Sequence, residues 1–227
     1  MVNLQVTKIY PYSDFPPQPD EQLKRRLTLV SGENDKNAAL FQNDAAFDWM
    51  YPEHFQLISL KQWTPIAVAR KAAEFFAEPG ARVLDIGSGI GKFCLTAAYH
   101  YPGTSFHGVE QRQELVYFAE EARQYTGLDN VSFINANITQ LDFSQFDHFY
   151  FYNSFYENID AENSIDDTIA TSFSLYSYYT QYLYKVLAEK PSGTRLVTFH
   201  CFDDVIPLDY CLVNASYDTL LRMWIKR

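Results

Sequence analysis

Three glycines at alternating positions stand at the centre of the stretch that could do chemistry. Residues 83–92 read Val-Leu-Asp-Ile-Gly-Ser-Gly-Ile-Gly-Lys. The apolar run predicts a buried strand, the glycines predict a tight turn that brings bare backbone against a ligand, and the residues after Gly91 predict a helix. The N-terminus of a helix presents unpaired N–H groups and a positive dipole end, so it favours a carboxylate or a phosphate. The turn therefore predicts a nucleotide-like ligand.

A second acidic residue, Glu110, lies 23 residues beyond Gly87 at the end of another predicted strand. A carboxylate in that place can accept hydrogen bonds from both ribose hydroxyls of a nucleoside. The glycine spacing bears on the kind of nucleoside, because a dinucleotide site needs its third glycine at position 92. Lys92 occupies that position. The spacing therefore favours a mononucleoside with a carboxylate-bearing tail over a pyrophosphate.

The elements that must position these residues alternate between strands and helices. Strands are predicted at residues 81–86, 104–110, 131–134, 146–152 and 194–199, and helices at 64–76, 91–100, 113–125 and 166–189. Residues 210–217 and 219–225 could close the sheet as an antiparallel pair. This order predicts an α/β protein with a doubly wound, mostly parallel seven-stranded sheet and helices on both faces. Thr64 is expected to cap its helix through its hydroxyl, and the tyrosines of helix 166–189 are assigned to the core.

Ligands of a doubly wound sheet bind at the carboxyl ends of its strands. Function is therefore expected at the 85–91 turn and at the residues that follow the next four strands, which are Glu110, Asn137, Asn153 and His200.

Residues 1–62 read differently from the rest and are expected to form an N-terminal helical and aromatic cover on a domain spanning 63–227. Helices are predicted from Asp20 to Val30 and from Asn34 or Asp35 to about Ala46. The aromatic cluster at 47–55 is expected to pack this segment onto the main domain, and the same residues could also roof the site.

Composition limits the partners and the compartment. The chain has 227 residues, with 18 basic and 28 acidic side chains and a formal charge of −10. This balance argues against a nucleic-acid backbone or an anionic membrane as the partner. The three cysteines lack paired or metal-ligand spacing, so no metal is expected, and with no leader or membrane-spanning pattern we expect a cytoplasmic protein.

The 83–91 stretch together with Gly108-Val109-Glu110 resembles the class I S-adenosylmethionine-dependent methyltransferases. The resemblance spans about residues 65–200, and the wider layout is similar to uncharacterised bacterial methyltransferase-like proteins. It implies a Rossmann-like domain in which the glycine turn holds the methionine part of the cofactor, Glu110 its ribose and Asn137 its adenine amino group. The expected cofactor-binding residues are Thr64, Asp85, Gly87, Ser88, Gly89, Glu110, Gln111 and Asn137. The motif wording also resembles the SET-less histone-lysine methyltransferases, but the chain lacks a basic tail for a nucleosome, so only cofactor binding is carried over.

The fourth strand end departs from the family pattern. Amino-group methyltransferases of this kind often carry Asn or Asp, two prolines and an aromatic residue there, and this chain has Asn153-Ser154-Phe155-Tyr156. The resemblance implies that Asn153 and Tyr156 meet the acceptor, while the alternative is a buried aromatic strand that leads into a loop. His200 is the best placed base if the acceptor must lose a proton, and His54 is the second candidate. Either can instead be an ordinary hydrogen-bonded histidine.

The sequence thus predicts an S-adenosylmethionine-dependent methyltransferase that acts on an unidentified small molecule or protein, with an amine nitrogen as one option and no nucleic acid or membrane partner. The expected catalytic residues are Asn153, Tyr156 and His200. Two alternatives stay open: a non-catalytic S-adenosylmethionine-binding protein and an NAD-dependent oxidoreductase.

Overall fold

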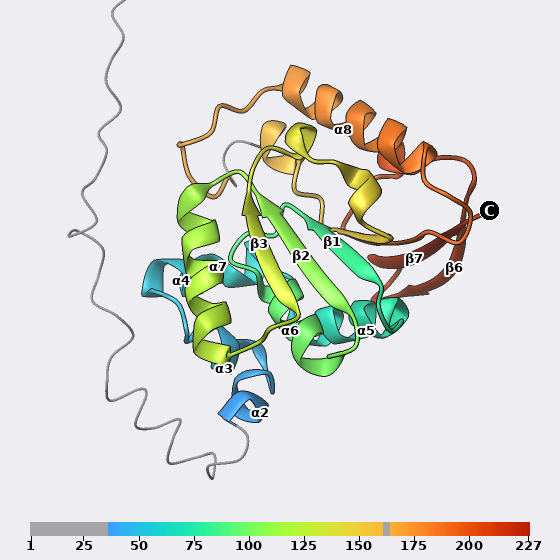
Figure 1. Cartoon of the computed structure of the whole chain (residues 1–227). Coiled ribbons are helices and arrows are strands. Elements are labelled where there is room, and N and C mark those ends of the chain that lie inside the picture. Colours follow the sequence, from blue (N-terminus) through green and yellow to red (C-terminus); the bar gives the residue numbers. More distant parts are fainter. Residues whose placement is uncertain (1–35, 161–163) are drawn as a thin grey trace, which may run out of the picture.

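The computed structural model describes residues 36–160 and 164–227, which fold around one seven-stranded sheet (Figure 1). The strand order is β3-β2-β1-β4-β5-β7-β6. The first five strands in this order pair in parallel, and β7 joins β5 and β6 antiparallel. The order reverses direction at β1, between β2 and β4, and a ligand of such a sheet is expected at that point. The predicted fold class is confirmed.

The observed elements follow the predicted ones closely from residue 64 onward. The strands are β1 Arg82–Ile86, β2 Ser105–Glu110, β3 Val131–Asn135, β4 His148–Phe151, β5 Arg195–Phe199, β6 Tyr210–Ser216 and β7 Leu221–Lys226. The main helices are α5 Ile66–Phe76, α6 Lys92–His100, α7 Gln113–Thr126 and α8 Phe173–Ala188. Short 3-10 turns connect them, including η2 Ile138–Gln140, η4 Tyr156–Asn158 and η6 Asp203–Val205.

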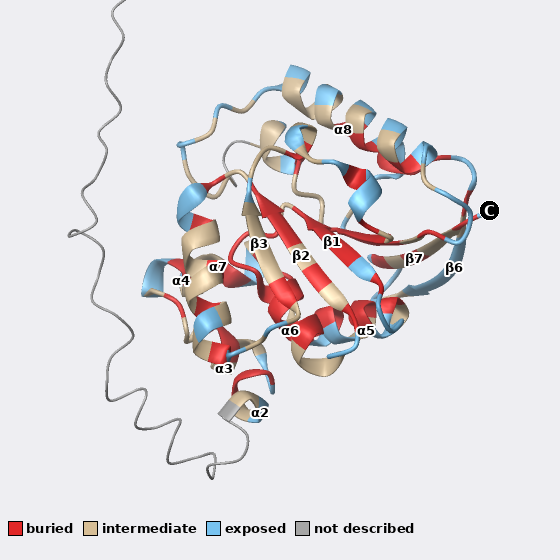
Figure 2. Cartoon of the chain, viewed as in Figure 1, coloured by how far each residue is buried: buried red, intermediate tan, exposed pale blue. Residues whose placement is uncertain are grey.

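Two hydrophobic clusters fill the two faces of the sheet, as the alternation of side chains along a strand requires. On β4, Tyr150 belongs to the cluster that includes α5, α6 and α7, whereas Phe149 and Phe151 belong to the cluster under α8. The central strands are buried along most of their length (Figure 2). This rigid centre fixes where the strand ends, and therefore the site residues, lie.

The cover segment joins the first of these clusters. Its described helices are α2 Lys36–Leu40, α3 Asp44–Asp48 and α4 Glu53–Gln62, so the single helix predicted up to about Ala46 is two short ones. Asn43 separates them because its side chain accepts the N–H of Ala46 and starts α3. Phe47, Tyr51 and Phe55 are buried, which agrees with the packing role expected for the aromatic cluster. The helix predicted from Asp20 to Val30 lies outside the described residues.

Lys92 ties the cover to the start of α6. Its ammonium, with a side chain 2% exposed, lies 2.6 Å from Asp48 Oδ1 and 2.7 Å from Asp44 Oδ1. Ser59 of α4 donates to the other oxygen of Asp48 at 2.5 Å. The residue that replaces a dinucleotide glycine is therefore the buried cation to which α3 and α4 attach.

Two local predictions are wrong. Thr64 does not cap α5, because its hydroxyl pairs with the Tyr150 hydroxyl at 2.9 Å, while the first N–H of the helix, from Ile66, donates to Asp44 at 2.9 Å. The helix predicted from residue 166 begins at Phe173 instead, because Ser172 caps it by accepting the N–H of Leu175. In the part of the chain that the structure describes, no helix combines the length and apolarity needed to cross a bilayer.

Candidate functional site

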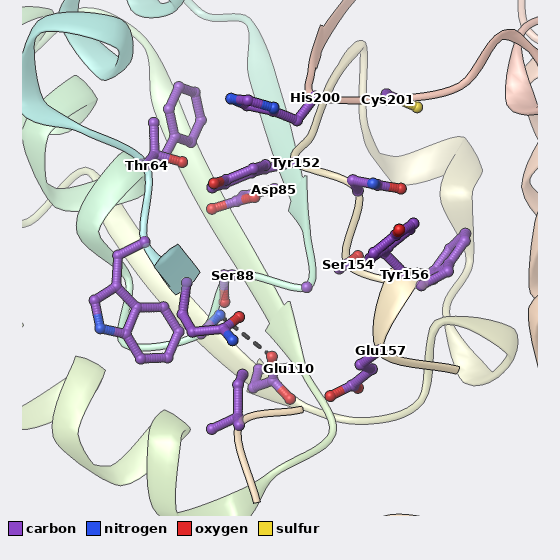
Figure 3. A pocket seen from close by; sticks show the side chains of 18 of the residues that line it. Thr64, Asp85, Ser88, Glu110, Tyr152, Ser154, Tyr156, Glu157, His200 and Cys201 are labelled. Atoms are coloured by element: carbon purple, nitrogen blue, oxygen red, sulfur yellow. Dashed lines mark hydrogen bonds between the residues drawn. The ribbon is translucent and has the colours of Figure 1, made fainter. Parts of the chain in front are cut away.

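A cavity of about 1050 Å³ opens at the carboxyl ends of the parallel strands (Figure 3). Every expected cofactor-binding residue and all three expected catalytic residues line it: Thr64, Asp85, Gly87, Ser88, Gly89, Glu110, Gln111, Asn137, Asn153, Tyr156 and His200. The volume suits a nucleoside-sized ligand with room for a second group. The structure therefore brings the predicted residues together in one place.

The glycine turn has the backbone form that its sequence predicts. Gly87 and Gly89 have positive φ angles of 76° and 53°, a region that other residues rarely adopt. A Cβ at Gly89 would collide with the ring of Trp63, and one at Gly87 would collide with Ser154. Trp63, the residue that ends α4, and Ser154, which follows β4, therefore both lie against the turn.

One polar group of the turn, the Ser88 hydroxyl, is left for a ligand. Ser88 Oγ is buried and has no hydrogen-bond partner among the described residues. α6 begins at Lys92 directly after the turn, so its first N–H groups have no partner within the helix. A partnerless buried hydroxyl beside a helix N-terminus fits a carboxylate-bearing ligand tail, as S-adenosylmethionine carries.

Glu110 presents a buried carboxylate to the same cavity. Its Oε1 accepts the N–H of Arg112 at 2.9 Å and its Oε2 accepts the N–H of Gly89 at 3.2 Å. Burial raises the pKa of this carboxyl, an effect that the two N–H groups and the Arg112 charge oppose. Each oxygen keeps a lone pair for a further donor, which fits the predicted bond to ribose hydroxyls.

Asp85 lies at the base of the cavity and is 3% exposed. Cys94 Sγ lies 3.6 Å from its Oδ2 as a weak donor. Burial raises the pKa of Asp85 to about 8, and the nearby charge of Glu110 adds to the rise. Asp85 is therefore a carboxyl that a cationic ligand group, such as an amino-acid ammonium, would stabilise in its ionised form.

Asn137 and Gln111 line the cavity and are hydrogen-bonded to each other. Asn137 Nδ2 donates to Gln111 Oε1 at 3.2 Å and to the Tyr179 hydroxyl at 2.7 Å, while its Oδ1 caps the turn η2. Tyr179 also lines the cavity. Tyr179 thus packs against the core cluster under α8, as predicted, and also contacts the site, which helical spacing could not show.

The residues predicted to contact the acceptor follow the buried strand β4. β4 ends at Phe151, and Asn153 follows with φ 37°. Ser154, which replaces a family proline, donates its hydroxyl to the Ile86 carbonyl at 2.9 Å and so attaches the loop to the end of β1. Tyr156 is 38% exposed, with its ring 6.0 Å from that of Phe202. These positions fit contact with an acceptor better than a buried strand that only leads into a loop.

His200 lies on the acceptor side, close to Tyr152 in Figure 3. Their ring centroids are 5.8 Å apart. Partial burial lowers the pKa of His200, so the ring is neutral at pH 7 and can accept a proton. His54, the second candidate, is exposed on α4 and does not line the cavity.

Sequence reasoning missed several lining residues, chiefly Trp63, Arg112, Glu157 and Phe202. Trp63 and Arg112 adjoin predicted site residues and could have been found by proximity. Glu157 adjoins Tyr156 in the same way. Phe202 has no signal in the sequence, because its closeness to Tyr156 depends on how the chain returns after β5.

Comparison with known proteins supports the nature of the domain. A family model described as a methyltransferase domain matches residues 77–180. A tRNA (guanine-N(7)-)-methyltransferase of Synechococcus sp. (strain JA-3-3Ab) is 54% identical over 55 residues, which are 24% of this chain and 23% of that protein. The protein of the same description from Prochlorococcus marinus (strain NATL1A) is 37% identical over 70 residues, 27% of this chain and 33% of that one. The chain thus spans a quarter to a third of the curated relatives it matches.

These relatives contradict the prediction that nucleic acid is excluded as a partner, since four of them are described as tRNA methyltransferases. The prediction failed because it rested on the net charge of the whole chain. Net charge describes the long-range field and does not decide which group can enter one cavity.

Among solved structures, an RNA methyltransferase from Salinibacter ruber in complex with S-adenosyl-L-homocysteine aligns with a TM-score of 0.52 at 21% identity, covering 72% of this chain and 92% of that one. TrmN from Thermus thermophilus aligns with a TM-score of 0.52 at 19% identity, covering 74% and 51%. These likenesses show the shared fold. Residues 77–180 thus match a methyltransferase-domain family model and lie in a fold that the chain shares with these two proteins.

Proposed function

We propose that this chain binds S-adenosylmethionine in the cavity and transfers its methyl group to a nitrogen atom of an acceptor. The observation that carries the proposal is the convergence of Glu110, the partnerless Ser88 hydroxyl and the glycine turn in one cavity of a methyltransferase domain. The same family match weighs against the NAD-dependent alternative.

Each cofactor residue has a role that its contacts support. Glu110 would accept the ribose hydroxyls, and the Ser88 hydroxyl with the first N–H groups of α6 would hold the methionine carboxylate. Asp85 would face the ammonium, and Gln111 and Asn137 would border the adenine. Thr64 would act through Tyr150, because its hydroxyl is already paired there.

The cofactor supplies a methyl group already activated on a sulfonium, so the chain needs mainly to align the acceptor. Asn153 and Tyr156 would orient the acceptor nitrogen toward the methyl group. A ring nitrogen with a free lone pair needs no base. A protonated amine must first lose a proton, and the neutral His200 would accept it.

For the acceptor we propose first a base nitrogen of RNA, which the descriptions of the curated relatives support. The exposed rings of Tyr156 and Phe202 offer a face on which a base could stack. An amine of a small molecule or protein is the second candidate. Three cations line the cavity: Lys92, Arg112 and Arg222. Each pairs with a carboxylate of the chain itself and so offers little charge for the phosphates of RNA, which supports this second candidate.

Two experiments test the proposal. Calorimetric titration with S-adenosylhomocysteine should give binding heat and NAD should give none, and no heat with S-adenosylhomocysteine would overturn the cofactor assignment. Labelled methyl transfer into cell extract, followed by nuclease, protease and size fractionation, should then place the label in RNA. Label in protein or small molecules would select the second acceptor class. Tight cofactor binding with no label anywhere would support a non-catalytic binding protein.

The division into a cover at 1–62 and a domain at 63–227 also remains a proposal, as does a cytoplasmic location. The family match at 77–180 falls inside the proposed domain.

A further inference from the structure

The guanidinium of Arg112 binds two carboxylates that lie 45 and 54 residues further along the chain. Its two terminal nitrogens donate to Glu157 at 3.1 and 2.7 Å, and its Nε donates to Asp166 at 3.0 Å. The Arg112 side chain is 4% exposed and that of Glu157 is 13% exposed. A two-pronged bond of this kind fixes direction as well as distance, and a lysine could not reproduce it.

Arg112 also contacts the cofactor end directly. Its backbone N–H is one of the two that hold the Glu110 carboxylate, at 2.9 Å. Arg112 therefore contacts Glu110, the carboxylate proposed to bind ribose, through its backbone, and Glu157 through its side chain.

The acceptor loop, residues 153–160, depends on such a contact. Its short turn is held by local bonds, in which the N–H groups of Tyr156 and Ile159 donate to the carbonyls of Asn153 and Tyr156 at 2.9 Å each. Two of its polar contacts reach distant parts of the chain, from Ser154 to Ile86 and from Glu157 to Arg112. Tyr156 is partly exposed and lies between these two anchors, so burial alone does not fix its ring.

We propose that Arg112 is a positioning residue, which holds Glu157 so that the neighbouring Tyr156 faces the acceptor beside the bound cofactor. This inference rests on the proposed function for its consequence in catalysis. The structural part, that Arg112 orders the loop, can be tested without any cofactor.

Amide hydrogen exchange on the full chain tests this inference. In Arg112→Met, the amides of residues 156–160 should exchange at least about tenfold faster, while those of β1 and β2 keep their protection. Arg112→Lys should give an intermediate rate, because the charge remains and the fork is lost. Arg123→Met is the matched control, since Arg123 pairs with Glu120 on the surface of the same helix, and loop exchange should not change.

Two further measurements separate positioning from cofactor binding. Calorimetry with S-adenosylhomocysteine should give a Kd for Arg112→Met within about threefold of wild type, whereas kcat for labelled methyl transfer should fall at least about tenfold. If the Kd for S-adenosylhomocysteine weakens as much as kcat falls, Arg112 serves Glu110 and the positioning role is wrong.

A variant of the ion-pair partner, Glu157, keeps the test decisive if Arg112→Met does not fold. Glu157→Gln leaves Arg112 paired with Asp166 and should speed loop exchange in the same direction. Unchanged exchange at residues 156–160 in a folded Arg112→Met or Glu157→Gln protein would overturn the proposal. If the wild type does not bind S-adenosylhomocysteine, the proposed function fails, and the exchange comparison still decides whether Arg112 orders the loop.

Discussion

The carboxylate of Glu110 is buried, yet it accepts two backbone N–H groups, so it is held in one orientation before any ligand arrives. Preorganisation of this kind reduces the entropy lost on binding. Glu110→Gln keeps the shape, but one of its two terminal atoms becomes an N–H donor that faces another donor. We expect the Kd for S-adenosylhomocysteine to rise about 10- to 100-fold, which corresponds to about 1.4 to 2.8 kcal/mol.

Calorimetry at pH 7 measures this change. Glu114→Gln is the matched control, because Glu114 is exposed at the start of α7, the helix that follows β2, and the Kd of this variant should not change. An equal loss in both variants, or none in Glu110→Gln, would contradict the ribose assignment.

Asp85 makes a second residue-level prediction, which concerns stability and pH. Because the pKa of this carboxyl rises from 3.8 to about 8 on folding, the folded state holds a proton that the unfolded state has lost between those pH values. The contribution of Asp85 to the free energy of unfolding therefore falls as pH rises through this window, by up to about 1.4 kcal/mol per pH unit. Asp85→Asn lacks this pH dependence and should gain stability relative to wild type from pH 5 to pH 8.

Urea unfolding at pH 5 and pH 8, without cofactor, measures the effect. Asp129→Asn, at an exposed site, serves as the control, and its difference from wild type should not vary with pH in the same way. A difference between Asp85→Asn and wild type that stays constant from pH 5 to pH 8 would show that Asp85 is ionised when buried.

At the level of elements, Lys92 connects the start of α6 to α3 and α4. Lys92→Met would leave Asp48, whose side chain is 12% exposed, without its cation, and breaking a buried pair from one side costs about 3–5 kcal/mol. We expect a decrease of this size in the free energy of unfolding. The double variant Lys92→Met with Asp48→Asn should recover part of it, because no uncompensated charge stays buried.

Denaturant titration measures these values. Lys71→Met is the control, because Lys71 is half-buried on α5, and we expect its free energy of unfolding to change by less than about 0.5 kcal/mol. A decrease below about 1 kcal/mol in Lys92→Met would mean that the cover is held by its apolar packing alone.

Local patterns were enough to predict the strands, the turn and the edge of the sheet where the site lies. The predicted residues meet in one cavity because parallel strands end at the same edge. The start of α8 at Ser172 could not be predicted, because the sequence offers other cap residues such as Asp166. The role of Asp44 at the start of α5 was also hidden, because Asp44 lies 22 residues before Ile66 and approaches it only in the folded chain. The partners of Arg112 were equally hidden, because they lie 45 and 54 residues away and no periodicity connects them.

On the scale of the whole molecule, the chain has a formal charge of −10, yet the curated relatives that it matches are described as tRNA methyltransferases. The negative charge and an RNA acceptor are compatible if the chain recognises RNA mainly through a base and through few phosphates. Lys92, Arg112 and Arg222 are engaged with carboxylates and offer little charge for binding phosphates. The number of counterions released on RNA binding should therefore be small.

This reasoning gives a prediction about salt. If about three phosphates are neutralised, log affinity for single-stranded RNA against log salt concentration should have a slope of about −2, so affinity falls about 16-fold from 50 to 200 mM salt. The KM for RNA in the labelled transfer assay at four salt concentrations measures this slope. A slope steeper than about −5 would contradict the prediction and would direct attention to Lys24, Arg25 and Arg26, which lie outside the described residues. Changing these three residues to Gln should then flatten the slope, because each phosphate that is no longer neutralised reduces it by about 0.7.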